Sequence, residues 1–304
     1  MARYRYYTAD VFTDTPFGGN QLAVFPDARN IPERRLQDVA REFNFSETTF
    51  VYPAETQEGT RRVRIFTPGA ELPFAGHPTI GTAHVLAAIG ELVSSTSELR
   101  IVLDEPVGPV PVTITLREGR PVFAQLSVAK LPELGPPAPG REALAHVLGL
   151  ELDDFLPDPW IPQGYSCGLP FLFVPVRNRA AVARAQLRLD AWERTLKGTW
   201  ASEIHLFARD AERPGSDLRA RVFVPGLSVP EDPATGSANA ALAGYLAARD
   251  TRRDGTLRWR VEQGFEMGRP SILDVEADLR DGMVTAVRVG GSSVLVCDGT
   301  MEIA

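Results

Sequence analysis

Two matching loops carry the polar residues best placed to do chemistry. His77 opens the run His-Pro-Thr-Ile-Gly-Thr-Ala, and Asp232 opens Asp-Pro-Ala-Thr-Gly-Ser-Ala 155 residues later (232 minus 77). Similar strand-like lead-ins precede the two loops, at residues 64–69 and 221–226. The repeat indicates an internal duplication in which each copy places a polar side chain at the amino end of a helix.

The amino end of a helix suits a bound carboxylate. Its first N–H groups have no partner within the helix, and the helix dipole adds a partial positive charge. His77 and Asp232 could therefore contact the polar groups of a small anionic substrate. The alternative is that each is only an N-cap, which suits Asp232 better than His77 because aspartate is a favoured capping residue.

Ser237 and Thr82 occupy equivalent positions one turn into the two helices. Either hydroxyl could bind substrate or bond locally to the backbone, and the local bond is more expected for Thr82. Gly76 and Gly236 would let a ligand approach the backbone closely, or would satisfy a turn conformation.

Glu47 lies among apolar residues, between Phe45 and Phe50. Burial there would raise the pKa of its carboxyl towards neutrality and make it a competent proton shuttle. A solvated glutamate after a helix is the plainer alternative, and spacing alone does not decide between them.

The composition describes an ordinary globular protein of 304 residues with a net charge of −7. Without a concentrated basic stripe, that charge argues against a nucleic-acid or anionic-membrane partner. The amino terminus lacks a signal-peptide pattern, and no apolar run reaches the roughly 20 residues of a membrane span. Two cysteines, Cys167 and Cys297, cannot form a disulfide framework, so we expect a cytoplasmic protein.

Other chemistries have little support. His77 and His84 are seven residues apart without a fitting carboxylate, and the other two histidines are isolated, so no metal site is predicted. The loop at residues 76–81 is neither a phosphate loop nor a dinucleotide fingerprint, so no cofactor is predicted.

Strand patterns dominate the chain and surround one prominent apolar helix per half, which favours an α+β fold. Strands are expected at residues 4–12, 21–26, 48–52, 63–66, 99–103, 110–116, 121–128, 171–176, 204–208, 220–224, 257–262, 271–277, 283–289 and 292–297. Helices are expected at residues 32–43, 77–90, 141–150, 180–196 and 236–249.

Four prolines within residues 131–140 mark the boundary between two domains, because such a stretch holds neither a helix nor a central strand. The amino-terminal domain is predicted to comprise residues 1–130 plus about 291–304, with Glu47 and the first loop. Residues 131–290 then form the carboxy-terminal domain, with the second loop.

Three stretches together closely resemble the PhzF-like, or phenazine-biosynthesis-like, family. They are Phe-Ser-Glu-Thr-Thr-Phe-Val at residues 45–51, Glu-Leu-Pro-Phe-Ala-Gly-His-Pro-Thr-Ile-Gly-Thr-Ala at 71–83, and Glu-Asp-Pro-Ala-Thr-Gly-Ser-Ala at 231–238. Their order and spacing agree from residue 10 to residue 299.

The resemblance implies a diaminopimelate-epimerase-like fold: two similar domains, each a mixed sheet rolled around a central helix, with the active site in the cleft between them. It also implies a cofactor-independent isomerase, usually a homodimer, that moves a proton on a small carboxylate. In the phenazine enzyme the substrate is trans-2,3-dihydro-3-hydroxyanthranilate, and a glutamate moves a proton from C3 to C1 to yield a ketone.

The same resemblance implies roles for single residues. Glu47 occupies the place of the catalytic glutamate, and His77, Asp232 and Ser237 match the other active-site side chains. Asn20 falls in the substrate loop, although Gln21 stands where the phenazine enzyme has proline.

Two alternatives stay open. Related epimerases use one cysteine from each repeat, but neither repeat loop here contains cysteine, so an epimerase or racemase would need Glu47 with His77 or Asp232. A protein that only binds a metabolite is the other alternative, and the presence of Glu47 disfavours it.

Overall fold

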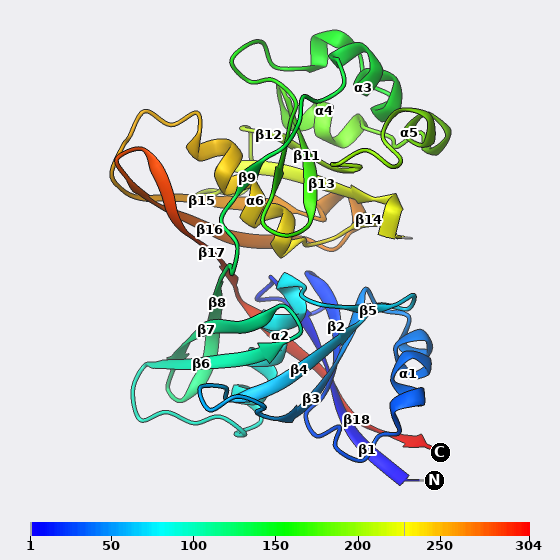
Figure 1. The fold of residues 1–304 in the computed structure, drawn as a ribbon, viewed down its shortest axis with the longest axis vertical. Coiled ribbons are helices and arrows are strands. Elements are labelled where there is room, and N and C mark those ends of the chain that lie inside the picture. The colour runs from blue at the N-terminus through cyan, green and yellow to red at the C-terminus, as the bar shows by residue number, and fades with distance from the viewer. Residues whose placement is uncertain (1, 228) are drawn as a thin grey trace. The chain divides into compact units, whose positions relative to one another are not determined.

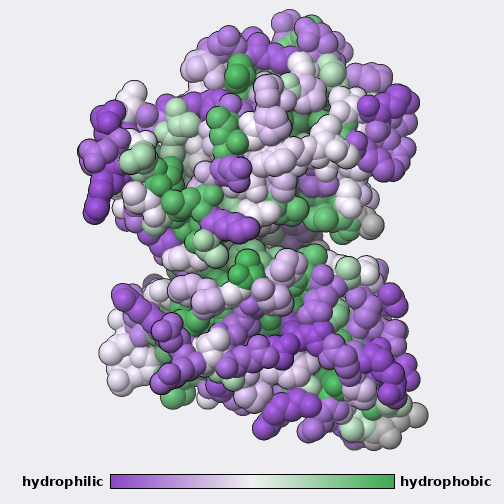
Figure 2. Space-filling view, viewed as in Figure 1, coloured by the Kyte–Doolittle hydropathy of each residue, from purple (hydrophilic) through white to green (hydrophobic). Residues whose placement is uncertain are grey.

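The computed structural model describes residues 2–227 and 229–304, and the chain divides into two compact units (Figure 1). Unit 1 comprises Met1–Ala129 and Gly290–Ala304, and unit 2 comprises Lys130–Val289. Hydrophilic residues cover much of the face of each unit seen in Figure 2, with hydrophobic residues in smaller patches. None of the helices in the described residues has the length and apolar character needed to cross a bilayer.

Unit 1 contains a mixed sheet, whose order runs β18-β1-β2-β3-β4-β6-β7-β8. Its elements are β1 (Ala2–Val11), β2 (Asn20–Phe25), η1 (Glu33–Arg35), α1 (Leu36–Phe43), β3 (Glu47–Pro53), β4 (Arg61–Phe66), β5 (Glu71–Leu72), α2 (Gly76–Ala88), β6 (Glu98–Glu105), β7 (Gly108–Arg117), β8 (Arg120–Ser127) and β18 (Ser293–Ile303). The parallel pairs are β2–β3 and β4–β6.

Helix α2 forms the centre of unit 1. It contacts strands from both ends of the sheet, including β1, β18, β7 and β8, so the sheet wraps around it. Every residue from Gly76 to Ala87 is buried, which explains why the helix is apolar on all sides. On the outer face of the sheet, α1 packs Leu36, Val39 and Ala40 against aromatic residues of the strands.

Unit 2 repeats this order of connections. Its elements are β9 (Glu133–Leu134), α3 (Arg141–Leu148), η2 (Leu152–Asp154), β10 (Gln163–Ser166), β11 (Pro170–Val176), α4 (Arg179–Arg184), α5 (Leu189–Thr195), β12 (Glu203–Ala208), β13 (Leu218–Val224), η3 (Pro225–Leu227), β14 (Val229–Asp232), α6 (Gly236–Ala247), β15 (Gly255–Gln263), η4 (Phe265–Met267), β16 (Ser271–Arg280) and β17 (Met283–Gly291). Helix α6 is the buried counterpart of α2.

The pairing of strands shows the duplication directly. In unit 1 a parallel pair, β2–β3, is followed by the antiparallel pairs β3–β4 and β4–β5, then α2, then the parallel pair β4–β6. In unit 2 the corresponding pairs are β11–β12, β12–β13, β13–β14 and, after α6, β13–β15. The predicted α+β class, with a mixed sheet and a central helix in each half, is confirmed.

Two local predictions need correction. Helix α2 begins at Gly76, after the N-cap Ala75, one residue before the predicted start at residue 77. Residues 180–196 form two short helices instead of one, because the chain is extended at Ala185. The guanidinium of Arg221 donates to the carbonyls of Val182 and Ala185 and so satisfies the end of α4.

Candidate active site

Three predicted site residues of unit 1 meet around the imidazole of His77. His77 lies in the first turn of α2, and its Nε2 is 3.1 Å from Oε2 of Glu47, the first residue of β3. The other ring nitrogen, Nδ1, is 3.2 Å from Nδ2 of Asn20, which begins β2. Parallel pairing of β2 and β3 places Leu22 opposite Glu47, and this register brings the two strand starts together.

The imidazole of His77 lies beside Glu47 as a neutral group rather than as a cation. The side chain is 5% exposed, and burial lowers its pKa to about 3, against a smaller opposing effect of a hydrogen bond to the Gln21 backbone. The Asn20 amide and Nδ1 lie within hydrogen-bond distance, whereas Nε2 and Oε2 of Glu47 are in close contact without the geometry of a hydrogen bond. A neutral imidazole therefore lies against Glu47 and forms no ion pair with its carboxylate.

Glu47 is both supported and reachable. Its side chain is 13% exposed, although the Oε2 atom is buried. The sharp turn before it is set by Asn44, which ends α1 with φ of 53° in the left-handed region that asparagine tolerates. The side chain therefore combines a close contact with His77 and partial exposure.

A buried hydroxyl pair ties α2 to the strand that carries Glu47. The Oγ1 atoms of Thr82 and Thr49 are 2.8 Å apart, and neither residue is exposed. Thr82 was predicted to contact substrate, whereas its hydroxyl is directed at β3 inside the unit. In this position it fixes His77 and Glu47 relative to one another.

Gly81 permits the close approach of α2 to the sheet. A Cβ atom at this position would lie 2.5 Å from Cδ2 of Leu22 and 2.6 Å from Cγ2 of Val11. Gly76, predicted to contact substrate through its backbone, is the buried first residue of the helix. The N-cap of α2 is Ala75 and His77 is the second residue of the helix, so the alternative in which His77 is only an N-cap does not apply.

Glu105, which sequence patterns did not single out, is buried at the end of β6 beside the same helix. The Oγ1 of Thr79 donates to its Oε1 over 2.7 Å. Burial raises the pKa of the carboxyl to about 8, although the Thr79 bond opposes this. Glu105 therefore holds its proton at neutral pH and supports the first turn of α2 as an uncharged acid.

The second loop is built on a polar network inside unit 2. Asp232 ends β14, and its carboxylate accepts a hydrogen bond from Oγ1 of Thr235. Nε2 of the fully buried Gln263 donates to the Asp232 carbonyl over 2.8 Å. The N-cap of α6 is Thr235 without a side-chain capping bond, so Asp232 is not the cap.

Ser237 and Gly236 lie within the first turn of α6, with Gly236 buried and Ser237 partly exposed. Below them Nδ2 of Asn239 donates to the Thr235 carbonyl and to Oε1 of Gln263, both over 2.9 Å. Gln263 and Asn239 thus fix the loop geometry. Gln263 could not be found from the loop motif, because it comes from β15, a strand beyond the helix.

Neither repeat loop contains a cysteine. Cys167 follows β10, and burial raises the pKa of its thiol to about 12, so it is protonated at neutral pH. Cys297 is exposed on β18, opposite Thr8 of β1.

Known proteins are similar to this chain over nearly its whole length. Residues 9–299 match the family of phenazine biosynthesis-like proteins. An uncharacterized isomerase of Mesorhizobium japonicum is 38% identical over 306 residues, which cover 100% of both chains. The trans-2,3-dihydro-3-hydroxyanthranilate isomerase of Pseudomonas aeruginosa is 35% identical over 299 residues, 97% of this chain and 98% of that one.

A solved structure agrees with these relatives. The PhzF-family phenazine biosynthesis protein of Bacillus anthracis superposes with a TM-score of 0.89 at 26% identity and covers 100% of both chains. The chain therefore belongs to the phenazine biosynthesis-like family. It is an isomerase, as the names of its relatives indicate.

Proposed function

We propose that the reaction is a cofactor-independent proton transfer on a small carboxylate, with the carboxylate of Glu47 as the acid/base. The observation that carries the proposal is the 3.1 Å contact between Glu47 Oε2 and the buried, neutral His77. A carboxylate beside a neutral imidazole is not neutralised by an ion pair and can accept a proton from carbon. The same carboxyl, once protonated, can return that proton to another carbon.

The substrate proposal comes from the relatives. Because a relative at 35% identity is named trans-2,3-dihydro-3-hydroxyanthranilate isomerase, we propose that compound or a similar cyclic carboxylate as substrate. Proton removal at C3 and return at C1 would leave the atoms of the substrate unchanged in number and give a ketone. No electron acceptor is needed for such a shift.

Asp232 and Ser237 complete the proposal as residues that bind polar groups of the substrate. Their support is the built network of Thr235, Gln263 and Asn239, which fixes the loop that carries them. Asp232→Asn and Ser237→Ala are expected to weaken turnover while the protein stays folded.

The decisive experiment replaces Glu47 by glutamine. Glu47→Gln keeps the shape of the side chain and removes the base, so turnover should fall by about 10² to 10⁴. In heavy water the wild type should exchange a substrate or product hydrogen for deuterium, and the variant should not. Glu42→Gln, on the exposed face of α1, is the matched control and should leave both rates unchanged.

Two other results would point elsewhere. Full turnover by Glu47→Gln would overturn the assignment of the base. Binding of carboxylates without any deuterium exchange in the wild type would favour a protein that only binds a metabolite, and inversion at one carbon would favour an epimerase.

A further inference from the structure

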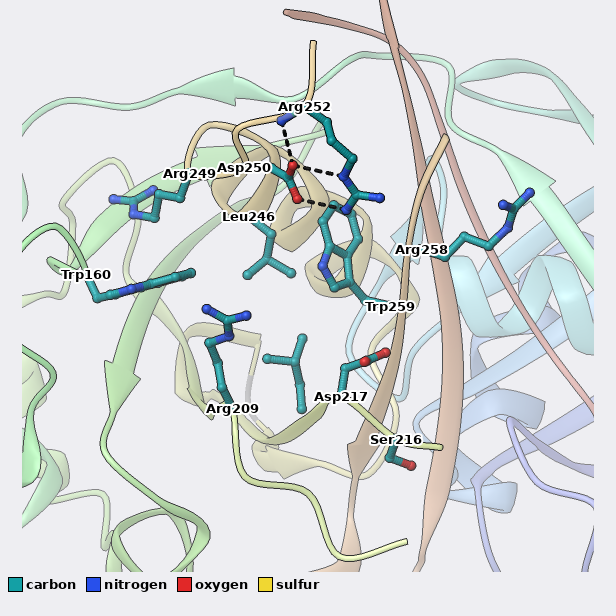
Figure 3. Close-up of a pocket in the computed structure, with 11 residues that line it drawn as sticks. Trp160, Arg209, Ser216, Asp217, Leu246, Arg249, Asp250, Arg252, Arg258 and Trp259 are labelled. Atoms are coloured by element: carbon teal, nitrogen blue, oxygen red, sulfur yellow. Dashed lines mark hydrogen bonds and ion pairs between the residues drawn. The ribbon is translucent and has the colours of Figure 1, made fainter. Parts of the chain in front are cut away.

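Unit 2 contains a cavity of about 490 Å³ at the carboxyl end of α6 (Figure 3). Leu246, Arg249 and Asp250 line it at that helix end, and Trp160 and Arg209 come from loops. Because α6 has 12 residues and a helix rises 1.5 Å per residue, the cavity lies about 18 Å from the Asp232 loop. It is therefore a separate place in the molecule from the candidate active-site residues.

Arg209 supplies a positive charge that is only partly offset, through a long-range attraction to Asp250 that is the smallest of the causes lowering the pKa of that carboxyl. It follows β12 and is exposed, and its guanidinium carbon lies 4.9 Å from the centroid of the Trp160 ring. Within the part of the chain that the structure describes, this guanidinium has no hydrogen bond and no ion pair. Its donors point into the cavity in Figure 3 and are available to a ligand.

Arg249 adds a second charge beside the same ring, with its guanidinium carbon 5.9 Å from the Trp160 centroid. It donates to the carbonyls of Tyr245 and Pro159 and to Oε1 of Gln163, over 2.9, 3.2 and 3.0 Å. All three acceptors are neutral groups. The side chain is thus fixed in place, and no carboxylate neutralises its charge.

The remaining charges of the cavity are mostly paired. Arg252 donates to both carboxylate oxygens of Asp250 over 3.0 and 2.8 Å, and Arg258 donates to Glu276 over 2.9 Å. Leaving these pairs aside, two arginines, Arg209 and Arg249, face one carboxylate, Asp217. A local excess of positive charge in a protein of net charge −7 favours an anionic ligand.

Two tryptophans, Trp160 and Trp259, also line the cavity and indicate a ligand with a flat ring. Figure 3 shows Trp160 with the two arginines on one side of the cavity and Trp259 with Asp217 on the other. Indole faces pack well against planar rings, and Leu246, 5% exposed, adds apolar surface. The volume lies in the range of pockets that hold small molecules.

We propose that this cavity binds a planar organic anion, a flat ring that carries a carboxylate or a phosphate, with Arg209 as the residue that contacts the anionic group. Arg249 strengthens the field around that group, and Trp259 supplies the aromatic wall for the ring, because guanidinium groups lie over the indole of Trp160. The proposal concerns a second ligand site and does not depend on the reaction proposed for Glu47.

Titration calorimetry of the full chain with four probes tests it. Benzoate and adenosine monophosphate each pair a flat ring with an anion, whereas cyclohexanecarboxylate lacks the flat ring and inorganic phosphate lacks any ring. We expect saturable binding of benzoate or of adenosine monophosphate, at least about threefold tighter than the matching probe without a flat ring. The tighter of the two identifies a carboxylate or a phosphate as the anionic group.

Matched variants locate the site. Arg209→Gln should weaken binding about tenfold or more, because a charge-assisted contact is lost. Arg213→Gln is the control, since Arg213 is also exposed in unit 2 and its guanidinium carbon also lies over an aromatic ring, 5.0 Å from Phe265. It removes the same charge outside the cavity and should change binding less than twofold.

Tryptophan fluorescence gives an independent readout, because two of the four tryptophans line the cavity. The signal change on binding should be smaller in Trp160→Phe than in the wild type, with Trp259 reporting the remainder. Absence of saturable binding by both ring anions, equal binding by Arg209→Gln and wild type, or equal affinity for benzoate and cyclohexanecarboxylate would each overturn the proposal.

Discussion

The protonation of His77 decides what the Glu47 carboxylate can do. A charged imidazole beside Glu47 would form an ion pair with the carboxylate and so lower its basicity. The buried ring, whose pKa is lowered to about 3, instead contacts the carboxylate as a neutral group. Asn20 contributes from β2 through its amide, 3.2 Å from the other ring nitrogen, so three separate segments position the ring.

We expect that His77 does not titrate in the physiological range. Its ring carbon resonances should keep the neutral pattern from about pH 8 to about pH 5, whereas an ordinary histidine changes near 6.5. Histidine-selective NMR measures this directly, and His77→Gln assigns the signal. A transition near pH 6.5 in that signal would contradict the neutral role assigned to the ring.

At the scale of elements, the position of α2 within its sheet sets the site geometry. The helix touches strands at both ends of the sheet, and the Thr49–Thr82 hydroxyl pair and the Thr79–Glu105 bond fix it at two points. Gly81 lets the helix approach β1 and β2 closely. A small shift of α2 relative to the sheet would move His77 away from Glu47.

Gly81→Ala tests the close packing of α2 against β1 and β2. The added methyl group would meet side chains at 2.5 and 2.6 Å, so we expect a loss of about 1–3 kcal/mol in the free energy of unfolding, together with reduced turnover. Chemical denaturation and activity assays measure the two effects. Gly69→Ala is the control: its Cβ would meet only Thr67 at 3.7 Å, an ordinary contact. Equal stability of both variants would show that a methyl group fits between α2 and the sheet, and would contradict the close packing at Gly81.

At the scale of the whole molecule, buried histidines link stability to pH. Three of the four histidines, His77, His84 and His205, are buried, and burial lowers the pKa values to about 3, 4 and 4. Between these values and 6.5, the unfolded chain binds protons that the folded chain does not. Stability contributed by each neutral histidine is therefore lost as the pH falls through that window. The buried carboxyl of Glu105 acts in the opposite direction, since its pKa is raised.

His84→Gln isolates one of these contributions. The stability lost between about pH 6.5 and about pH 4.5 should be smaller in this variant than in the wild type by about 1.4 kcal/mol per pH unit, the effect of one proton. Denaturant unfolding at several pH values measures the slope. His146→Gln, exposed on α3, should leave it unchanged. Parallel curves for wild type and His84→Gln would refute the coupling.

The sequence by itself determined the features that rest on local pattern. The α+β class and most strands of each half follow from periodicity and turn residues, whereas the family and the isomerase class follow from the resemblance carried by three long motifs. The internal copy of the loop was visible because a duplicated strand-loop-helix unit keeps its own residue order. Local pattern also led to errors, as when residues 180–196 read as one helix although Arg221, from a distant strand, satisfies the end of α4.

Only the tertiary structure decided which side chains meet. Asn20, Glu47 and His77 come from two strands and a helix, and their contacts depend on how the sheet wraps around α2. The same is true of Glu105 beside Thr79 and of Gln263 beneath Asp232. The physical reason is that burial and hydrogen bonding between distant segments are set by packing of the whole unit, and they determine which titratable groups stay neutral.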